Sequence, residues 1–441
     1  MLNRIIVMCG VCAWMTAGTA SAQTRPSNLA TLFEGVFGPT GLTVSSNDVQ
    51  LDGTNHAAHF NSSFQSDFRL VNIALAEQLT ALPLPSPAAG FTYKFDASTG
   101  TFVRSTTSFG PILAERGATI GRHRIAFGAN YQFFSFDQLD GTPLSDVPAV
   151  FRHDAYMTTP GRDDVIGTDN AIQATVTQLT GALTYGLTDR IDISAAVPIV
   201  RTRLSLLSND TIERVGTGPE TGVHYFYDPS ALDNHGTSHQ FFAEGEAGGV
   251  GDVVLRAKGN LLREGRRALA AGLDVRLPTG DELNLLGSGA LGVRLFAALS
   301  ASSRGVAPHM NVGYQWNGRS VLAGDVHSGA KADMPDQFQV DAGSDVSVNP
   351  RLSLAFDVFA DRLLDSPRLR TFPFTAAGPF GSVDLRDLSF ETASFWTGSG
   401  SIGLKTNVAS RILINVNLRF AIGHAGLTDR LTPLVGMEWA F

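Results

Sequence analysis

Apolar and polar residues alternate with a period of two along most of this chain after about residue 121. The clearest example is "RILINVNLRFAI", in which Ile412, Val416 and Phe420 belong to an apolar set and Arg411 and Arg419 to a polar one. Successive side chains of a β-strand point to opposite faces of its sheet. The pattern therefore predicts strands with one apolar face and one face that carries charge.

Twelve segments carry this pattern, and the connections between them alternate in length. Short turns such as "LTDR" (187–190) and "NPR" (349–351) follow every second segment, whereas connections such as 208–248 and 365–391 are long. Tight turns on one side and variable loops on the other are typical of an up-and-down β-barrel in a membrane. The segments lie near 121–137, 169–186, 189–207, 249–264, 266–278, 287–301, 305–318, 334–348, 351–364, 392–408, 410–422 and 429–441.

A membrane also explains why such a sheet would close. Hydrocarbon offers no hydrogen-bond partners, so an open sheet edge would leave costly unsatisfied backbone groups. A tilted strand needs only about 9–11 residues to cross, and no apolar stretch of about 18 residues follows the N-terminal segment, which excludes a helical membrane protein. We predict an all-β fold, a transmembrane antiparallel up-and-down β-barrel of about twelve strands, or fourteen if residues 91–106 join the wall. A soluble β-sandwich is the alternative that period two alone leaves open.

The N-terminal stretch "MLNRIIVMCGVCAWMTAGTASAQ" predicts export. A positive Arg4 precedes an apolar run and a small-residue cleavage site, so residues 1–22 are typical of a secretory signal peptide. A single membrane anchor, or a lipoprotein signal through Cys9 or Cys12, is the alternative. Both cysteines of the chain lie here, so the exported part would hold no disulfide, no cysteine zinc site and no cysteine nucleophile. The formal net charge of −8 argues against nucleic acid as a partner.

The C-terminal "LVGMEWAF" reads as the last strand of the barrel. Val435, Met437, Trp439 and Phe441 would face lipid while Glu438 faces the lumen. Aromatic residues at the end of such a strand are typical of the membrane interface. We expect Trp439 and Phe441 to serve as a signal for the outer-membrane assembly machinery, and the strand to close the barrel against 121–137.

Residues 23–120 lack the alternation of the barrel segments. They contain an expected short helix near 69–82, stopped by Pro83, and an expected hairpin around Ser98-Thr99-Gly100 in "FTYKFDASTGTFVRS". As an N-terminal periplasmic segment they could plug the lumen, cap it from below, or supply two further strands. If residues 23–90 form a plug, their removal should raise nonspecific solute flux.

Several stretches of the barrel region resemble a known family. The stretches are "SFGPILAERGATIGRHRIAFGANYQFFSFDQLDG" (108–141), "YGLTDRIDISAAVPIV" (185–200), "GVGDVVLRAKGNLL" (249–262) and "DVRLPTGDELNLLGSG" (274–289). On these residues the chain resembles the outer-membrane barrel family named for the MetA pathway of phenol degradation, which is distantly similar to the long-chain fatty acid channels. The resemblance covers most of 90–441 and implies a Gram-negative outer-membrane location and uptake of hydrophobic or aromatic compounds.

Turning the apolar face toward lipid leaves charged residues of both signs facing inward. Our first interpretation is a salt-bridged, hydrated lumen; the alternative is a filter that orients a carboxylate or phenolate while its apolar part passes along Phe134, Phe136, Phe296 and Phe359. The candidate lumen-lining residues are Arg124, Asp192, Asp252, Arg256, Lys258, Asp274, Arg276, Arg294, Asp341, Asp345, Arg351, Asp357, Arg411, Arg419 and Glu438.

The sequence offers little for catalysis. No nucleophile elbow of the "GxSxG" type is present, so we predict no enzyme, no catalytic residue and no cofactor. His235 and His239, with Asp228 and Asp233 nearby, have the residue types of a metal site, but a polar surface loop is the favoured interpretation and no metal is predicted.

The sequence therefore predicts three parts: a signal peptide (1–22), an N-terminal plug or periplasmic segment (23–120) and an outer-membrane barrel (121–441). The expected function is a channel for passive uptake of small hydrophobic or aromatic compounds, with outer-membrane lipids and the assembly machinery as further partners. The alternative is a barrel with a lipid-active enzymatic role or a surface-binding role through its long loops.

Overall fold

A computed structural model describes most of the region from residue 108 onward and short parts of the chain before it. The predicted signal peptide, the predicted helix near 69–82 and Phe441 lie outside the described residues. Within the described part, no helix combines the length and the apolar character needed to cross a membrane. The described residues are 28–38, 41–44, 57–60, 93–96, 101–104, 108–154, 156–158, 162–219, 223–230, 235–409 and 411–440.

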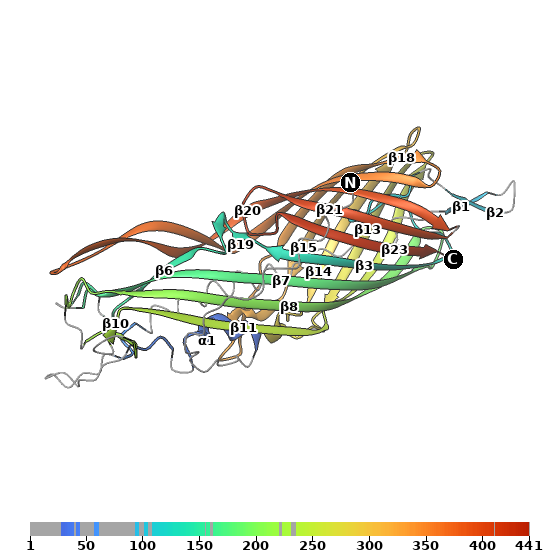
Figure 1. Cartoon of the computed structure of the whole chain (residues 1–441). Coiled ribbons are helices and arrows are strands. Elements are labelled where there is room, and N and C mark those ends of the chain that lie inside the picture. Colours follow the sequence, from blue (N-terminus) through green and yellow to red (C-terminus); the bar gives the residue numbers. More distant parts are fainter. Residues whose placement is uncertain are drawn as a thin grey trace.

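Antiparallel strands form a closed wall (Figure 1). Going round the ring, the order is β8, β12, β13, β14, β15, β18, β19, β20, β21, β23, β3 and β7, and β7 pairs again with β8. Closure leaves no sheet edge in the hydrocarbon. The wall strands are β3 (Ile125–Phe136), β7 (Val165–Gly186), β8 (Ile191–Glu213), β12 (Val253–Glu264), β13 (Arg267–Leu277), β14 (Gly292–Ala301), β15 (Val306–Asn317), β18 (Gln337–Asn349), β19 (Leu352–Gly378), β20 (Gly381–Ala409), β21 (Ile412–Ile422) and β23 (Leu431–Ala440).

The predicted barrel of about twelve strands is confirmed. Each predicted segment overlaps one wall strand, and β23 closes the ring against β3, as expected from the C-terminal sequence. The sheet counts 14 strands in all because β6 (Val147–Arg152) pairs with β7 and β11 (Ser238–Val250) pairs with β8. The hairpin expected around Ser98-Thr99-Gly100 is present as β1 (Tyr93–Asp96) and β2 (Thr101–Arg104), but it forms a separate two-stranded sheet and does not join the wall.

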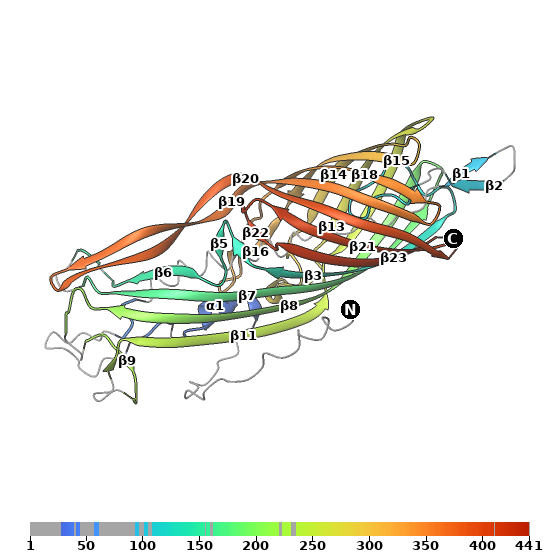
Figure 2. The ribbon, with the colours of Figure 1, turned by 45° about the horizontal axis from the view of Figure 1, so that its top comes forward.

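Two regions expected to be long loops are largely strand. β19 and β20 continue their pairing from Ser366↔Ala393 to Gly378↔Gly381 and project as a long hairpin beyond the ring (Figures 1 and 2). β8 likewise extends to Glu213, where it pairs with β7 and β11. These extensions lie opposite the short turns, on the extracellular side of an outer-membrane barrel. Sequence pattern missed them because, outside lipid, an outward face does not need to be apolar.

The outer surface changes character along a single strand. On β8 the outward Val197 and Ile199 are exposed and apolar, whereas the next outward residues, Arg201 and Arg203, are charged and both pair with Glu246 of β11. An apolar outer band followed by charge is the profile of a strand leaving a bilayer. The extracellular boundary of the membrane therefore lies near Arg201.

Exposed aromatic side chains mark both boundaries of this apolar band. Trp439 lies near the periplasmic end of β23 and Trp316 near the extracellular end of β15, and Trp396 lies within β20, opposite Arg362 and close to where the projecting hairpin begins; all three side chains are 40–48 % exposed. Aromatic residues concentrate at membrane interfaces because one end of the ring system is apolar and the other polar. The chain is a barrel of the bacterial outer membrane.

A charge placed in the apolar band should weaken the barrel. Leu295 on β14 faces outward and is 64 % exposed, so we expect Leu295→Arg to lower the free energy of unfolding from lipid vesicles by about 2–4 kcal/mol. The measurement is urea titration followed by the change in gel mobility between unboiled and boiled samples. Gln240→Arg, outward on β11 beyond Arg201, is the matched control and should change stability little; equal losses in both variants would contradict the position of the band.

The remaining elements lie at the extracellular ends or before the wall. A short helical turn formed by η1 (Leu29–Thr31) and α1 (Leu32–Gly35) contacts β8 and β11, as Figure 2 also shows. The other described elements are β4 (Gln138–Leu139), β5 (Thr142–Pro143), β9 (Phe226–Tyr227), β10 (His235–Gly236), η2 (Glu282–Asn284), β16 (Arg319–Asp325), β17 (Ala330–Asp333) and β22 (Leu427–Thr428).

Candidate functional site

Residues 108–120, which directly precede β3, occupy the periplasmic half of the barrel interior; we call them the plug segment. All of them but Leu113 are buried. The inward side chain of Asn311 accepts a hydrogen bond from the Glu115 backbone N–H (2.7 Å) and donates one to the Glu115 carbonyl (2.9 Å). The ammonium of Lys405 donates to the carbonyl of Pro111 (2.9 Å). Side chains of the wall thus satisfy the backbone of a segment that has no strand partner of its own.

Ion pairs hold the same segment. The carboxylate of Glu115 pairs with Arg256 and with Lys258, at 3.0 Å from the Lys258 ammonium. The guanidinium of Arg116 lies 2.7 Å from the carboxylate of Asp345, and both side chains are nearly inaccessible. Paired charges tolerate burial far better than single ones. Polar contacts with the wall therefore hold the plug segment in the periplasmic half of the lumen.

A cavity of about 310 Å³ lies above the plug segment, inside the wall. Its charged side comes from β12, β13 and β14. Asp274 accepts hydrogen bonds from the guanidinium groups of Arg256 (2.6 Å) and Arg294 (3.0 Å), so one carboxylate joins two cations on neighbouring strands. Asp341 of β18 and Arg419 of β21 also line the cavity.

Aromatic rings lie beside these charges. The guanidinium carbons of Arg256 and Arg294 are 5.2 and 5.0 Å from the ring centre of Phe296, within the range of a cation–π contact. Gly272 on the adjacent strand makes room for this ring, since a Cβ there would lie 2.2 Å from Phe296 Cζ. Phe359 stands in a similar relation to Arg419, at 5.5 Å. The cavity thus offers both cations and π-faces to a bound molecule.

The extracellular half of the interior is apolar. Phe134 and Phe136 stack at 6.0 Å, and with Val200 they line the cavity. Leu29, Leu32, Phe33, Val36 and Phe37 pack against this region; together we call residues 28–38 the N-terminal cover. Gly245 on β11 permits the close approach, because a Cβ there would lie 2.6 Å from a Leu29 methyl group. Apolar contacts therefore lie on the extracellular side of the cavity and polar contacts on its periplasmic side.

The structure brings many of the predicted lumen residues together. Arg256, Asp274, Arg276, Arg294, Asp341, Arg419 and Asp252 line the cavity. Asp192, Lys258, Asp345, Asp357 and Glu438 are buried on the inward side of their strands, nearer the periplasmic end. Phe134, Phe136, Phe296 and Phe359 also line the cavity.

Three predicted lumen residues lie elsewhere. Arg351 and Arg411 are exposed in the short turns, so placing them in the lumen was wrong. Arg124 is half-buried ahead of β3, at the periplasmic rim. The error arose because the alternation was extended past the last paired residue. The pleat of the strand, which decides whether a side chain points inward or outward, ends there. Of the predicted assembly signal, Trp439 faces outward, and a role in assembly stays a prediction.

Sequence reasoning missed the residues that the plug segment contributes. Glu115 and Arg116 lie outside the periodic segments, and nothing in the alternation marks them. The available signal was their context: two adjacent charges in a Gly-rich stretch directly before the first strand. His309 was also missed; its ring lies between Asp357 (2.6 Å) and Asp345 (3.5 Å) on the inner wall.

A protein-family model matches residues 154–372 of this chain; it describes the family "Putative MetA-pathway of phenol degradation". This chain is an outer-membrane β-barrel related to that family. The match covers a continuous stretch from the end of β6 into the long hairpin, which includes the Arg256–Asp274–Arg294 cluster. The resemblance stated from the sequence is thus confirmed over residues 154–372, and the quoted stretch 108–141 lies outside the match. No curated protein matches the chain.

Solved structures that resemble this barrel include an outer-membrane channel from Pseudomonas putida F1, with 16 % identity and a TM-score of 0.45 over 74 % of this chain and 99 % of that one. A FadL homologue from Pseudomonas aeruginosa gives 11 % identity and a TM-score of 0.29 over 72 % and 89 % of the two chains. The translocator domain of the autotransporter NalP from Neisseria meningitidis gives 8 % identity and a TM-score of 0.35 over 73 % and 89 %.

Proposed function

We propose that this barrel admits small hydrophobic molecules, aromatic acids and phenols among them, passively across the outer membrane. The observation that carries the proposal is the cavity of about 310 Å³ enclosed by the transmembrane wall. This volume lies at the lower end of the range of about 300–1,000 Å³ typical of small-molecule pockets. It suits one small solute at a time rather than a continuous water column.

The lining supports an amphipathic solute. A carboxylate or phenolate would meet the guanidinium groups of Arg256 and Arg294, which form strong charge-assisted hydrogen bonds with such groups. The apolar body would lie against Phe296, Phe359 and the apolar extracellular half. The family description, which names phenol degradation, supports the same class of solute.

A solute can cross the barrel only if both the N-terminal cover and the plug segment move out of its way. The N-terminal cover is held mainly by apolar contacts and the plug segment by ion pairs and hydrogen bonds. A hydrophobic solute competes for the apolar contacts of the N-terminal cover, and water competes for the ion pairs and hydrogen bonds of the plug segment. We infer that the solute enters by displacing part of the N-terminal cover and leaves past the plug segment.

The proposal predicts selective effects on anionic solutes. We expect Arg294→Gln to lower benzoate uptake into proteoliposomes by about tenfold, the loss expected for one charge-assisted hydrogen bond, and to change uptake of uncharged phenol much less. Arg201→Gln, on the outer surface, is the matched control. Equal effects on both solutes would contradict an orienting role for Arg294.

The same vesicles separate a channel from a lipid-active enzyme. Accumulation of aromatic solute without any release of fatty acid from the phospholipid supports uptake. Phospholipid cleavage with no accumulation of solute would overturn the proposal in favour of the enzyme.

A further inference from the structure

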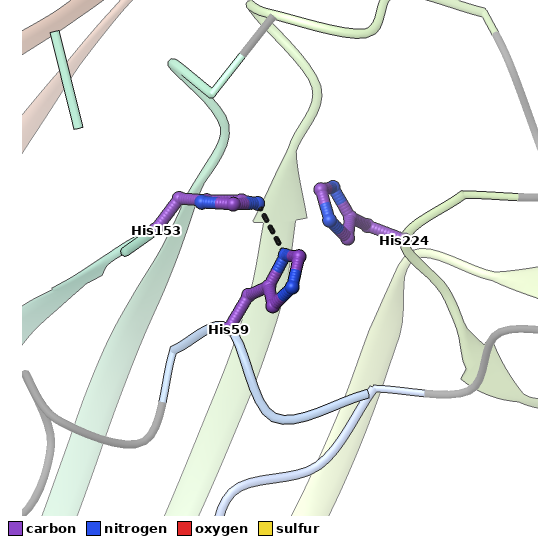
Figure 3. A group of neighbouring side chains, drawn as sticks. All are labelled: His59, His153 and His224. Atoms are coloured by element: carbon purple, nitrogen blue, oxygen red, sulfur yellow. Dashed lines mark hydrogen bonds between the residues drawn. The ribbon is translucent and has the colours of Figure 1, made fainter. Parts of the chain in front are cut away.

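Three histidines meet at the extracellular end of the barrel, outside the cavity (Figure 3). His153 directly follows β6, His224 lies just before β9, and His59 belongs to the N-terminal part of the chain. Each ring offers one nitrogen, and the three nitrogens lie within 4.8 Å of one another. His153 and His224 are almost completely buried, so the cluster is not a chance meeting of surface side chains.

The rings of His153 and His224 are fixed by acceptors on their far side. Nδ1 of His224 lies 2.7 Å from the carboxylate of Asp164, and Nδ1 of His153 lies 2.6 Å from the carbonyl of Asp154. An acceptor at one ring nitrogen keeps the proton there and leaves a lone pair on the other, which is the usual arrangement behind a metal-binding histidine. Both rings therefore present Nε2 as a ligand atom.

Asp164 is itself held in place. Its fully buried carboxylate accepts hydrogen bonds from the backbone N–H groups of Gly216 (2.8 Å) and Thr217 (3.0 Å) and from the Thr217 hydroxyl (2.6 Å). This network fixes the orientation of the His224 ring. A rigid second layer of this kind is characteristic of built metal sites.

His59 completes the cluster from a separate part of the chain. Its Nδ1 lies 2.7 Å from Nε2 of His153, a separation at which one proton is shared between the two nitrogens. Its carbonyl accepts the backbone N–H of Asp154 (2.7 Å), and the neighbouring Phe60 ring packs edge-on against His153 and His224. A metal ion would take the place of that shared proton, as metal binding to histidine generally does.

We propose that His59, His153 and His224 bind a divalent transition-metal ion, with Zn²⁺ as the preferred one, and that the ion fastens the N-terminal part of the chain to the extracellular end of the wall. Three imidazoles with a fourth position for water are a common zinc ligand set. Imidazole also suits Cu²⁺ and Ni²⁺, so selectivity is part of the test. The site is remote from the Arg256–Asp274–Arg294 cluster and does not depend on the proposed uptake function.

Metal binding is tested on the folded full-length mature chain in detergent, stripped with a chelator. Titration calorimetry with Zn²⁺ should give one equivalent, and Co²⁺ should produce the intense visible absorption of a four-coordinate site. His59→Gln, His153→Gln and His224→Gln should each weaken Zn²⁺ binding at least about tenfold, and Asp164→Asn about 10–100-fold. Gel mobility of unboiled samples verifies that every variant is folded.

His239→Gln is the matched control, because His239 lies in the same extracellular region but packs against the rings of Phe226 and Phe241. It should bind Zn²⁺ like the parent. Absence of binding by the folded parent, unchanged affinity in the three histidine variants, or an equal loss in His239→Gln would each overturn the site.

A separate measurement tests whether the ion fastens the N-terminal part of the chain to the wall. Zn²⁺ should slow amide hydrogen exchange in Leu29–Gly35 of the parent protein and have no effect in His224→Gln. Zn²⁺ binding that leaves exchange in these residues unchanged would overturn the fastening role. Stronger retention of Ni²⁺ than of Zn²⁺ in competition would overturn the assignment of the ion; Cu²⁺ is left out of this comparison because nitrogen ligands generally bind it more tightly than Zn²⁺.

Discussion

Replacing the plug segment with a flexible Gly/Ser linker of equal length should convert this closed barrel into an open pore. The linker keeps the chain connected but removes the carboxylate of Glu115 and the guanidinium of Arg116. The wall groups that bound them, Arg256, Lys258 and Asp345, would then be hydrated. A twelve-stranded wall encloses more space than the eight-stranded barrels that side chains fill.

We expect ion conductance in planar bilayers, and sucrose flux into proteoliposomes, to rise by at least about tenfold in this variant. Removal of residues 23–90 is the informative comparison. The sequence alone suggested these residues as the plug, yet their described parts lie in the extracellular half, and the polar closure by 108–120 would remain. Their removal should therefore raise uptake of hydrophobic solutes more than ion conductance. A folded linker variant that stays as impermeable as the parent would contradict the assignment of the plug segment.

The wall could be predicted because the bilayer imposes a simple rule on it. Each outward residue such as Val416 or Val435 must be apolar, and each inward neighbour such as Asn417 or Glu438 need not be, so facing follows from sequence alone. The same rule predicted Asp274 and Arg294 as inward. It failed at Arg351 and Arg411, which lie one step past the paired residues.

Other parts of the interior follow no periodic rule. Height along the barrel depends on strand tilt and register, so nothing in the sequence indicated that Asp274 would join Arg256 and Arg294. Glu115 reaches the lumen on a non-repetitive segment held by side-chain contacts. His59 and His153 are 94 residues apart in the sequence, and His224 lies farther along the chain. Only the folded chain brings the three histidines together. The sequence drew attention only to His235 and His239, for which a polar surface loop was the favoured interpretation and no metal was predicted; in the structure both rings pack against aromatic rings.

Removing the carboxylate of Asp274 should cost the barrel much of its stability. This side chain is 9 % exposed and binds two guanidinium groups, of Arg256 at 11 % and Arg294 at 23 % exposure. In Asp274→Ala the two cations would lie side by side on the same part of the cavity wall without their shared partner. Breaking a buried ion pair from one side typically costs about 3–5 kcal/mol, because the remaining charge stays buried. Urea unfolding in lipid vesicles, followed by gel mobility, should show a loss of this size.

The outer surface supplies a control with the same chemistry. Glu246 also joins two arginines, Arg201 and Arg203, but it is 32 % exposed and they are 62 % and 65 % exposed. Because water can replace the carboxylate there, Glu246→Ala should change the free energy of unfolding little. A double variant, Asp274→Ala with Arg294→Met, should recover part of the loss by removing one of the uncompensated cations. Equal losses for Asp274→Ala and Glu246→Ala would mean that the lumen is as well hydrated as the outer surface, and the cavity would then be an open aqueous passage rather than a binding chamber.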